Sequence, residues 1–216
     1  MRPIYLSYTP TELDADGIAL SQTPLGAGNL TLNGVLASGG AVTLGDQQFV
    51  SITWAGNDAA RTATVTGTNR SGAAITGTIA GANIGVTAST VAFYTVSQIA
   101  IDAATAGALT AGVNGLGYSR PVVLDQYIAP MNLALYFIPS GTITAEVQDT
   151  GDDIFASTYR DSTGTWIDHP TMTGMTTTQN GNYAFPPRAI RLNVTAATAG
   201  TPDPSAVLQI IQAGIT

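Results

Sequence analysis

Three carboxylates, Asp149, Asp152 and Asp153, form the densest group of residues that could do chemistry. Carboxylates at short spacing can bind a hard cation such as Ca²⁺ or work as an acid and base pair. Their spacing does not fit the EF-hand calcium loop, and aspartate is common in tight turns. We therefore expect turn structure at this cluster, with Ca²⁺ binding as the open alternative.

The sequence holds one histidine, His169, and no cysteine. A serine hydrolase needs a base beside its nucleophile, commonly on a Gly-x-Ser-x-Gly turn, and the sequence lacks this pentapeptide. Without cysteine, disulfides and thiolate zinc sites are excluded. We predict a chain that is not an enzyme, with no catalytic residue, no metal site of zinc type and no cofactor.

The charge content is low, at 10% of 216 residues, and the net charge is −7. All seven basic residues are arginine and form no cluster, which argues against nucleic-acid binding. No apolar run is long enough for a membrane span, and residues 1–17 lack the apolar core of a secretory signal. The surface is expected to be rich in hydroxyl groups, which suits close packing in an assembly.

Alternating apolar residues bounded by Gly, Asn and Asp predict many short strands and no helix. The clearest unit is a β-hairpin over residues 61–79 with a loop at 69–72. Further strands are predicted over residues 91–101, 108–113, 122–128, 133–138, 143–148, 189–194 and 207–212, with a long loop over 149–187. This pattern is typical of an all-β sandwich or barrel.

We predict an extended N-terminal arm over residues 1–17, an N-terminal β domain over 18–114 and a C-terminal β-sandwich domain over 115–216. The Gly-rich residues 114–117 suggest a linker at the boundary. In the arm, Ile4, Tyr5, Leu6 and Tyr8 could anchor to a neighbouring sheet edge. The alternative, given equal weight, is that residues 4–6 are simply the first strand.

Aromatic residues could line a sugar-binding groove, because a flat ring stacks on a sugar face. An aromatic on an alternating strand is more often core, and this is our expectation for Trp54. Trp166 and His169 lie in the long polar loop and are the candidate contact residues of an exterior carbohydrate- or receptor-binding module. Their exposure in one concave patch would favour that function.

Two sets of stretches resemble small virion proteins of tailed bacteriophages that are found beside the major capsid protein. The first set is residues 18–24, 28–34, 51–58 and 64–68, and the second is residues 140–153, 181–186, 189–195 and 210–214. The resemblance covers about half of the chain and transfers no active-site residue. It implies a capsid decoration (cement) protein, with a tail or neck component as the next possibility.

A decoration protein made in the bacterial host cytoplasm would be located in the virion. Its expected partners are the major capsid protein and further copies of itself, as a homotrimer, with no nucleic acid and no membrane. Such proteins act by burying apolar and hydroxyl-rich strand faces between subunits. The competing hypothesis remains the exterior carbohydrate- or receptor-binding module.

Overall fold

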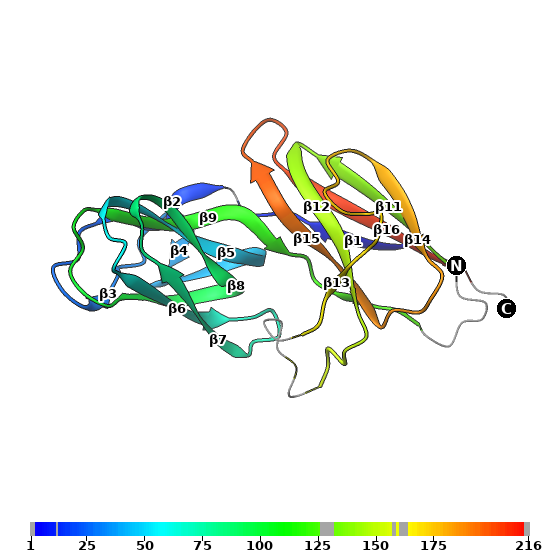
Figure 1. Cartoon of the computed structure of the whole chain (residues 1–216), viewed down its shortest axis with the longest axis horizontal. Helices are drawn as coiled ribbons and strands as arrows, with labels where there is room; N and C mark the ends of the chain where they lie inside the picture. The colour runs from blue at the N-terminus through cyan, green and yellow to red at the C-terminus, as the bar shows by residue number, and fades with distance from the viewer. Residues whose placement is uncertain (1–2, 12, 126–131, 157–158, 160–163, 214–216) are drawn as a thin grey trace. The chain divides into compact units, whose positions relative to one another are not determined.

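A computed structural model describes residues 3–11, 13–125, 132–156, 159 and 164–213. The described residues form antiparallel β-structure and contain no helix, so the all-β prediction is confirmed (Figure 1). The chain divides into two compact units. The continuous unit comprises residues 10–117, and the split unit comprises residues 1–9 together with 118–216.

The described residues of the continuous unit form eight strands, several of them long. They are β2 (Asp14–Gln22), β3 (Gly28–Asn29), β4 (Ala37–Ser38), β5 (Ala41–Asn57), β6 (Thr62–Thr68), β7 (Ala74–Ala80), β8 (Asn83–Ile101) and β9 (Leu109–Tyr118). The main order is β2-β9-β5-β8-β6-β7, with β3 beside β8 and β4 beside β5. Register shifts interrupt the β5–β8 pairing, and such irregularities let long strands bend around a core.

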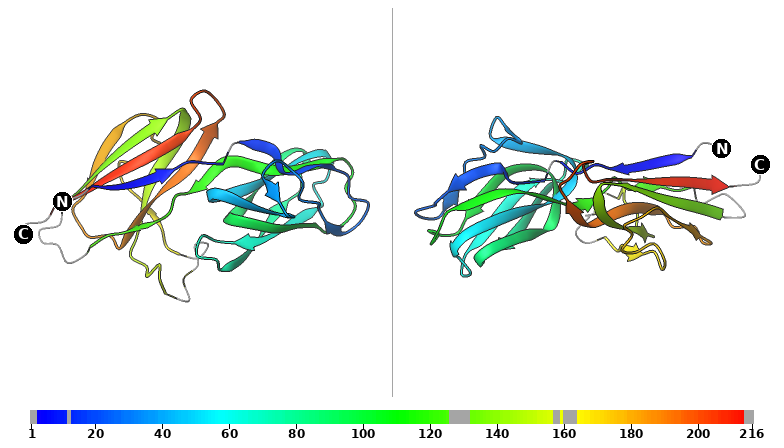
Figure 2. Two further views of the ribbon diagram at one scale, coloured as in Figure 1. Left: turned by 180° about the vertical axis from the view of Figure 1, so that it is seen from behind. Right: turned by 90° about the horizontal axis from the view of Figure 1, so that it is seen from above.

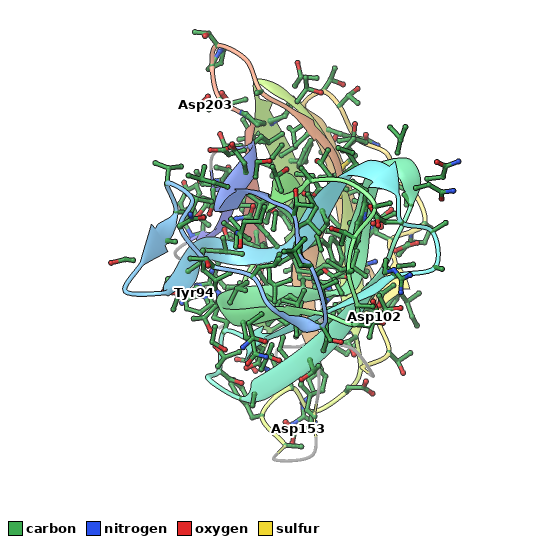
Figure 3. The ribbon with its side chains drawn as sticks, turned by 90° about the vertical axis from the view of Figure 1, so that its left-hand side faces the viewer. Tyr94, Asp102, Asp153 and Asp203 are labelled. Carbon is green, nitrogen blue, oxygen red and sulfur yellow. The ribbon has the colours of Figure 1, made fainter. Side chains whose placement is uncertain are left out.

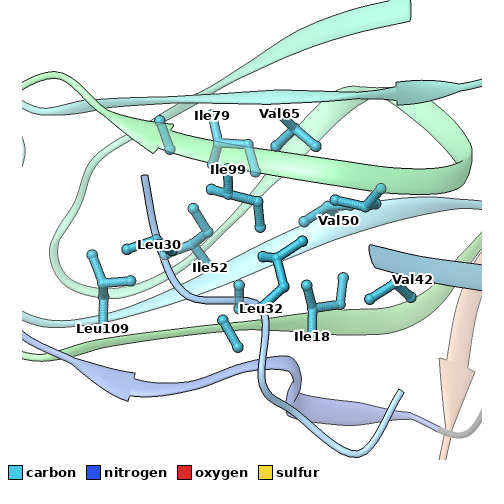
Figure 4. Packing of buried hydrophobic residues seen from close by; sticks show 14 of the residues in the cluster. Ile18, Leu30, Leu32, Val42, Val50, Ile52, Val65, Ile79, Ile99 and Leu109 are labelled. Carbon is cyan, nitrogen blue, oxygen red and sulfur yellow. The ribbon is translucent and has the colours of Figure 1, made fainter. Parts of the chain in front are cut away.

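One apolar core fills the continuous unit. Alternation along β5 buries Val42, Leu44, Val50, Ile52 and Trp54, as the sequence predicts. Side chains from other parts of the unit meet them, among them Ile18, Leu30, Leu32, Val65, Ile79, Ile99 and Leu109, which are labelled in Figure 4. The Trp54 indole N–H donates to Thr87 Oγ1 at 2.8 Å, so its one polar atom is satisfied inside the core.

The predicted hairpin is confirmed as β6 and β7. Residues Thr62–Thr68 pair in register with Ala74–Ala80, and the connecting turn begins at Asn69. Asn69 Oδ1 accepts hydrogen bonds from the Ala73 N–H at 2.9 Å and from the Ser71 hydroxyl at 2.7 Å. Gly72 has a φ of 82°, a conformation that glycine adopts without strain.

The split unit is a sandwich of two antiparallel sheets (Figure 2). Sheet A has the order β1-β16-β11-β14, and its strands are β1 (Ile4–Tyr8), β16 (Ser205–Ala213), β11 (Asn132–Ser140) and β14 (Gln179–Tyr183). Sheet B has the order β13-β12-β15-β10, and its strands are β13 (Ile167–Asp168), β12 (Thr142–Thr150), β15 (Ala189–Thr198) and β10 (Val122–Val123). Alternate residues of both sheets are buried, including Leu135, Phe137, Leu208, Val147 and Leu192.

The structure differs from the predicted arm over residues 1–17. Residues 4–8 form β1, which pairs along its whole length with β16 of the same chain, as the blue and red strands of Figure 2 show. Leu6 and Tyr8 are buried in the sandwich, and this burial holds the strand in place. Residues 14–17 begin β2 of the continuous unit. The alternative of a first strand at residues 4–6 is therefore the one observed.

Two further segments differ from the sequence-based expectation. Residues 114–117, predicted as a linker, lie within β9, and the division between the units falls at 117/118. The predicted loop over 149–187 contains β13 and β14. Strand β14 is a sheet edge made of Gln, Asn, Gly, Asn and Tyr, so hydrophobic alternation gives no sign of it. Of the predicted strand over 122–128, residues 126–128 lie outside the described residues.

Candidate functional site

The outward side of sheet A carries no charged residue among those the structure describes. This uncharged face consists of Tyr5, Ser7, Ala134, Tyr136, Ile138, Asn180, Asn182, Val207, Gln209 and Ile211. The strand register places Tyr5, Gln209, Tyr136 and Asn180 in one row across the four strands. Three large side chains stay open to solvent: Tyr5 is 62% exposed, Tyr136 40% and Ile138 44%.

The N-terminal candidate residues divide between the two sides of β1. Leu6 and Tyr8 are buried and Ile4 is half-buried, so these three contribute to the sandwich interior. Tyr5 alone of the four projects outward, and the Gln209 amide lies 3.4 Å from its hydroxyl. Tyr5 is thus the member of this set that can contact a partner.

The outward side of sheet B holds a buried arginine between two aromatic rings. The Arg191 guanidinium lies 3.7 Å from the ring centre of Tyr118 and 4.1 Å from that of Trp166, and only 5% of the residue is exposed. Arg191 Nε donates to Gln148 Oε1 at 2.9 Å, and the Trp166 indole N–H donates to Tyr159 Oη at 2.9 Å. Trp166 therefore covers a cation of its own chain.

Polar side chains on β12, β13 and β15 extend this arginine site. The Gln148 amide donates to Asp168 Oδ1 at 2.9 Å, and the Asn193 amide donates to Glu146 Oε1. The strand register places Gln148 opposite Arg191 and Glu146 opposite Asn193, so the sheet itself aligns the network. The network is a candidate recognition surface for a polar partner. Its described side chains do not include a nucleophile hydrogen-bonded to a general base.

His169 is buried and joins the two sheets of the split unit. Its Nδ1 accepts the backbone N–H groups of Thr171 and Met172, each at 3.2 Å. Because Nδ1 accepts, Nε2 carries the proton and donates to the Asn182 carbonyl on β14 at 3.1 Å. The His169 backbone N–H donates to Val147 on β12. Only 4% of His169 is exposed, so the residue has a structural role and links the two sheets. It does not form an open patch with Trp166.

A second buried polar contact crosses the sandwich interior. The Tyr183 hydroxyl on β14 donates to Asp149 Oδ1 on β12 at 2.9 Å, and the His169 ring packs edge-on against Tyr183. Burial raises the pKa of the Asp149 carboxyl, an effect that the Tyr183 hydrogen bond and His169 oppose. Burial, together with the Asp149 carboxylate, also raises the pKa of the Tyr183 phenol.

Raising the solution above pH 10 is expected to destabilise the chain through Tyr183. The unfolded phenol ionises near pH 10, whereas the folded one resists ionisation, so this contribution is complete below pH 10 and is lost as the pH rises further. Wild type should lose about 1.4 kcal/mol of unfolding free energy per pH unit more than Tyr183→Phe does. Urea unfolding of both proteins from pH 8 to 11 measures this difference, and parallel pH curves would refute it.

The three carboxylates of the acidic cluster have separate partners. Asp149 accepts from Tyr183, Asp152 accepts from the Thr165 N–H at 2.7 Å, and Asp153, labelled in Figure 3, pairs with Arg188 at 2.9 Å. Asp153 Oδ1 also accepts the Phe155 N–H, as expected of a turn aspartate. Within the described residues, no group of three or more His, Cys, Asp or Glu side chains is arranged to hold a metal ion.

Comparison with known proteins gives no relative for this chain. No protein-family model matches it, and no curated protein and no solved structure is detectably similar. The part of the chain that the structure describes contains no helix that could cross a membrane.

Proposed function

We propose that the chain is a non-enzymatic structural protein of a tailed-phage virion, most specifically a capsid decoration protein that binds the major capsid protein. The observation that supports this proposal best is the uncharged face of sheet A. The resemblance of residues 140–153, 181–186 and 189–195 to small virion proteins supports it further, because these stretches contribute to β12, β14 and β15 of the same sandwich.

An uncharged face suits a contact between subunits because few ions must be stripped of water when the contact forms. Burying an unpaired charge costs several kcal/mol, whereas apolar groups are buried with a gain, and hydroxyl and amide groups at little cost once they are hydrogen-bonded. Two strands of nine residues and two of five, at about 4.8 Å spacing and about 3.3 Å per residue, give a face of roughly 450 Å². This is a little over half of the roughly 800 Å² per partner of a standard protein–protein interface.

The proposal includes self-association as a homotrimer, the arrangement that the resemblance implies. Low charge supports it, since copies with only 10% charged residues repel one another weakly at close range. The alternative within this proposal is a location in the tail or neck of the particle. Binding to isolated heads and to isolated tails would distinguish the two locations.

Placing a charge on the uncharged face should weaken binding to shells. The Tyr136→Lys variant adds an ammonium to a side chain that is 40% exposed, so the fold should tolerate it. We expect a loss of tenfold or more in affinity, which corresponds to about 1.4 kcal/mol or more. The assay is co-sedimentation with phage shells that lack the protein, and a matched control is Leu25→Lys, at a 93% exposed position of the continuous unit.

Two results would contradict the proposal. Wild type that fails to sediment with shells excludes a decoration function. Equal binding by Tyr136→Lys and Leu25→Lys excludes the uncharged face as the contact.

The second candidate function is an exterior carbohydrate- or receptor-binding module. The exposed aromatic rings of Phe155 and Phe185, at 78% and 53% exposure, favour it, and Phe185 packs edge-on against Tyr183. Trp166 contributes less to this alternative because its ring already stacks on Arg191. Binding to host polysaccharide by a monomer that ignores shells, with loss of binding in Phe155→Ala and Phe185→Ala, would establish this function in place of decoration.

A further inference from the structure

Strand β7 ends the sheet of the continuous unit with an unprotected edge. Among the described residues it pairs with β6 alone, and it contains no proline and no charged residue. Natural proteins usually protect such edges with lysine, proline or a bulge, because an open row of N–H and C=O groups pairs readily with another strand. Strand β7 has no proline, charged residue or bulge against β6, so its outer edge can accept another strand.

The sequence of β7 reads the same in both directions. Its seven residues are Ala74, Ile75, Thr76, Gly77, Thr78, Ile79 and Ala80, so Gly77 is the centre of a palindrome. In an antiparallel pair a strand faces its neighbour in the reverse direction. A palindromic strand therefore presents every side chain to an identical one when it pairs with itself across a two-fold axis through Gly77.

The hydrogen bonds at both ends of the hairpin show which backbone groups are open. The Asn69 N–H donates to the Ala73 carbonyl, and the Gly81 N–H donates to the Arg61 carbonyl. Because bonded residues alternate along an antiparallel strand, odd-numbered positions of β7 bond to β6 and even-numbered positions face the free edge. Consistently, the Ala80 carbonyl accepts a hydrogen bond from the Thr87 hydroxyl, which lies outside the hairpin.

We propose that the partner of this edge is strand β7 of a second copy of the chain, paired antiparallel about Gly77. Thr76 then faces Thr78 of the second copy, and each such pair exchanges two backbone hydrogen bonds. Ala74 faces Ala80 at either end of the contact, where the Ala80 carbonyl already accepts the Thr87 hydroxyl. This contact goes beyond the proposed decoration function and does not depend on it. Combined with the proposed homotrimer, it joins two trimers into an assembly of six copies.

The side chains on the outer surface of the hairpin fit this pairing. On the outer surface Thr64 already faces Thr78 and Thr66 faces Thr76, so the two-fold contact extends two rows of threonines across four strands. Cross-strand threonine pairs stabilise a sheet through their hydroxyl and methyl groups. On the inner surface Ile79 is fully buried in its own copy and only Ile75 is half-buried, so the outer threonine rows provide the side-chain fit of the contact.

The test uses the opposition of positions 76 and 78. In the Thr76→Lys, Thr78→Lys variant two ammonium groups face each other twice, and like charges directly opposite destabilise a strand pair. In the matched Thr76→Lys, Thr78→Glu variant each ammonium faces a carboxylate instead. Both variants change the same two exposed side chains, and they differ in the charge at position 78, which also lies beside residue 76 on the same face of the strand.

The readout is the solution mass of the full chain by analytical ultracentrifugation over a concentration series. We expect wild type and the lysine–glutamate variant to reach an even number of copies, and the lysine–lysine variant to reach half that number at the same concentration. Circular dichroism of each variant verifies that it is folded. A wild-type mass that stays at one copy or at an odd number, or a lysine–lysine mass equal to wild type, overturns the proposal.

Discussion

The Arg191→Ala variant should lose about 3 kcal/mol of unfolding free energy. The guanidinium makes a charge-assisted hydrogen bond to Gln148 and lies against two aromatic rings, and contacts of these kinds contribute about 1 to 3 kcal/mol each when buried. Its removal also leaves the ring of Trp166 without the surface on which it packs. Urea unfolding measures the loss, and a red shift of tryptophan fluorescence should accompany it.

The Arg191→Lys variant is the control for charge. Lysine keeps the positive charge but lacks the planar group that stacks between Tyr118 and Trp166. We expect it to recover less than half of the lost stability. Full recovery of stability in Arg191→Lys would mean that charge alone matters at this site. An unchanged unfolding free energy in Arg191→Ala would show that the stacking of Arg191 on Tyr118 and Trp166 does not stabilise the fold.

A single methyl group at Gly67 is expected to be equally damaging. A Cβ atom built there would lie 1.8 Å from the Thr95 carbonyl oxygen and 3.1 Å from the Phe93 ring. The register of β6 on β8 shifts between Thr66 and Gly67, and this bulge brings the two backbones together. Gly67→Ala must push the strands apart. We expect it to lower the unfolding free energy by about 3 kcal/mol, the upper end of the range for substitutions that overpack a core.

Gly26→Ala is the matched control, because no atom lies within 4 Å of the Cβ position at Gly26. Thermal unfolding should separate the two variants by roughly 10 °C for a unit of this size. Equal melting temperatures would show that the β6–β8 bulge relaxes without cost.

The hairpin shows what the sequence makes predictable. Threonine and small apolar residues alternate through residues 62–68 and 74–80, and an Asn-Arg-Ser-Gly turn separates them, so local information is sufficient. The same holds for β5, where buried positions follow the period of two. Trp54 is in the core, as an aromatic on an alternating strand should be.

The pairing of β1 with β16 depends on contacts between residues about two hundred positions apart, and no local pattern encodes it. The sequence predicts either an arm or a first strand for Ile4, Tyr5, Leu6 and Tyr8. Only the tertiary structure distinguishes these two possibilities. The arginine site is a similar case. Arg191 follows the alternation of β15 as an outward residue, but its burial comes from Tyr118 and Trp166, which lie far away in the sequence.

His169 was a candidate for contact with a partner and is placed in the interior by three backbone groups. A histidine before proline gives no sequence sign of that environment. The sequence indicates this burial only through nearby residues. Met172 and Met175 are apolar residues in a polar stretch, and both are buried against β12. Spaced apolar residues of this kind mark a segment that packs on the sandwich.

The split unit has a consequence for synthesis on the ribosome. All strands of the continuous unit have been made once residue 117 has left the exit tunnel, whereas β1 must wait for β16, which ends near residue 213. At about 5 to 20 residues per second, this interval lasts roughly 5 to 20 s. During this interval Leu6 and Tyr8 have no sheet to enter. A nascent chain therefore passes through a stage at which the continuous unit is complete while β1 of the split unit is still unpaired, because β16 has not yet been made.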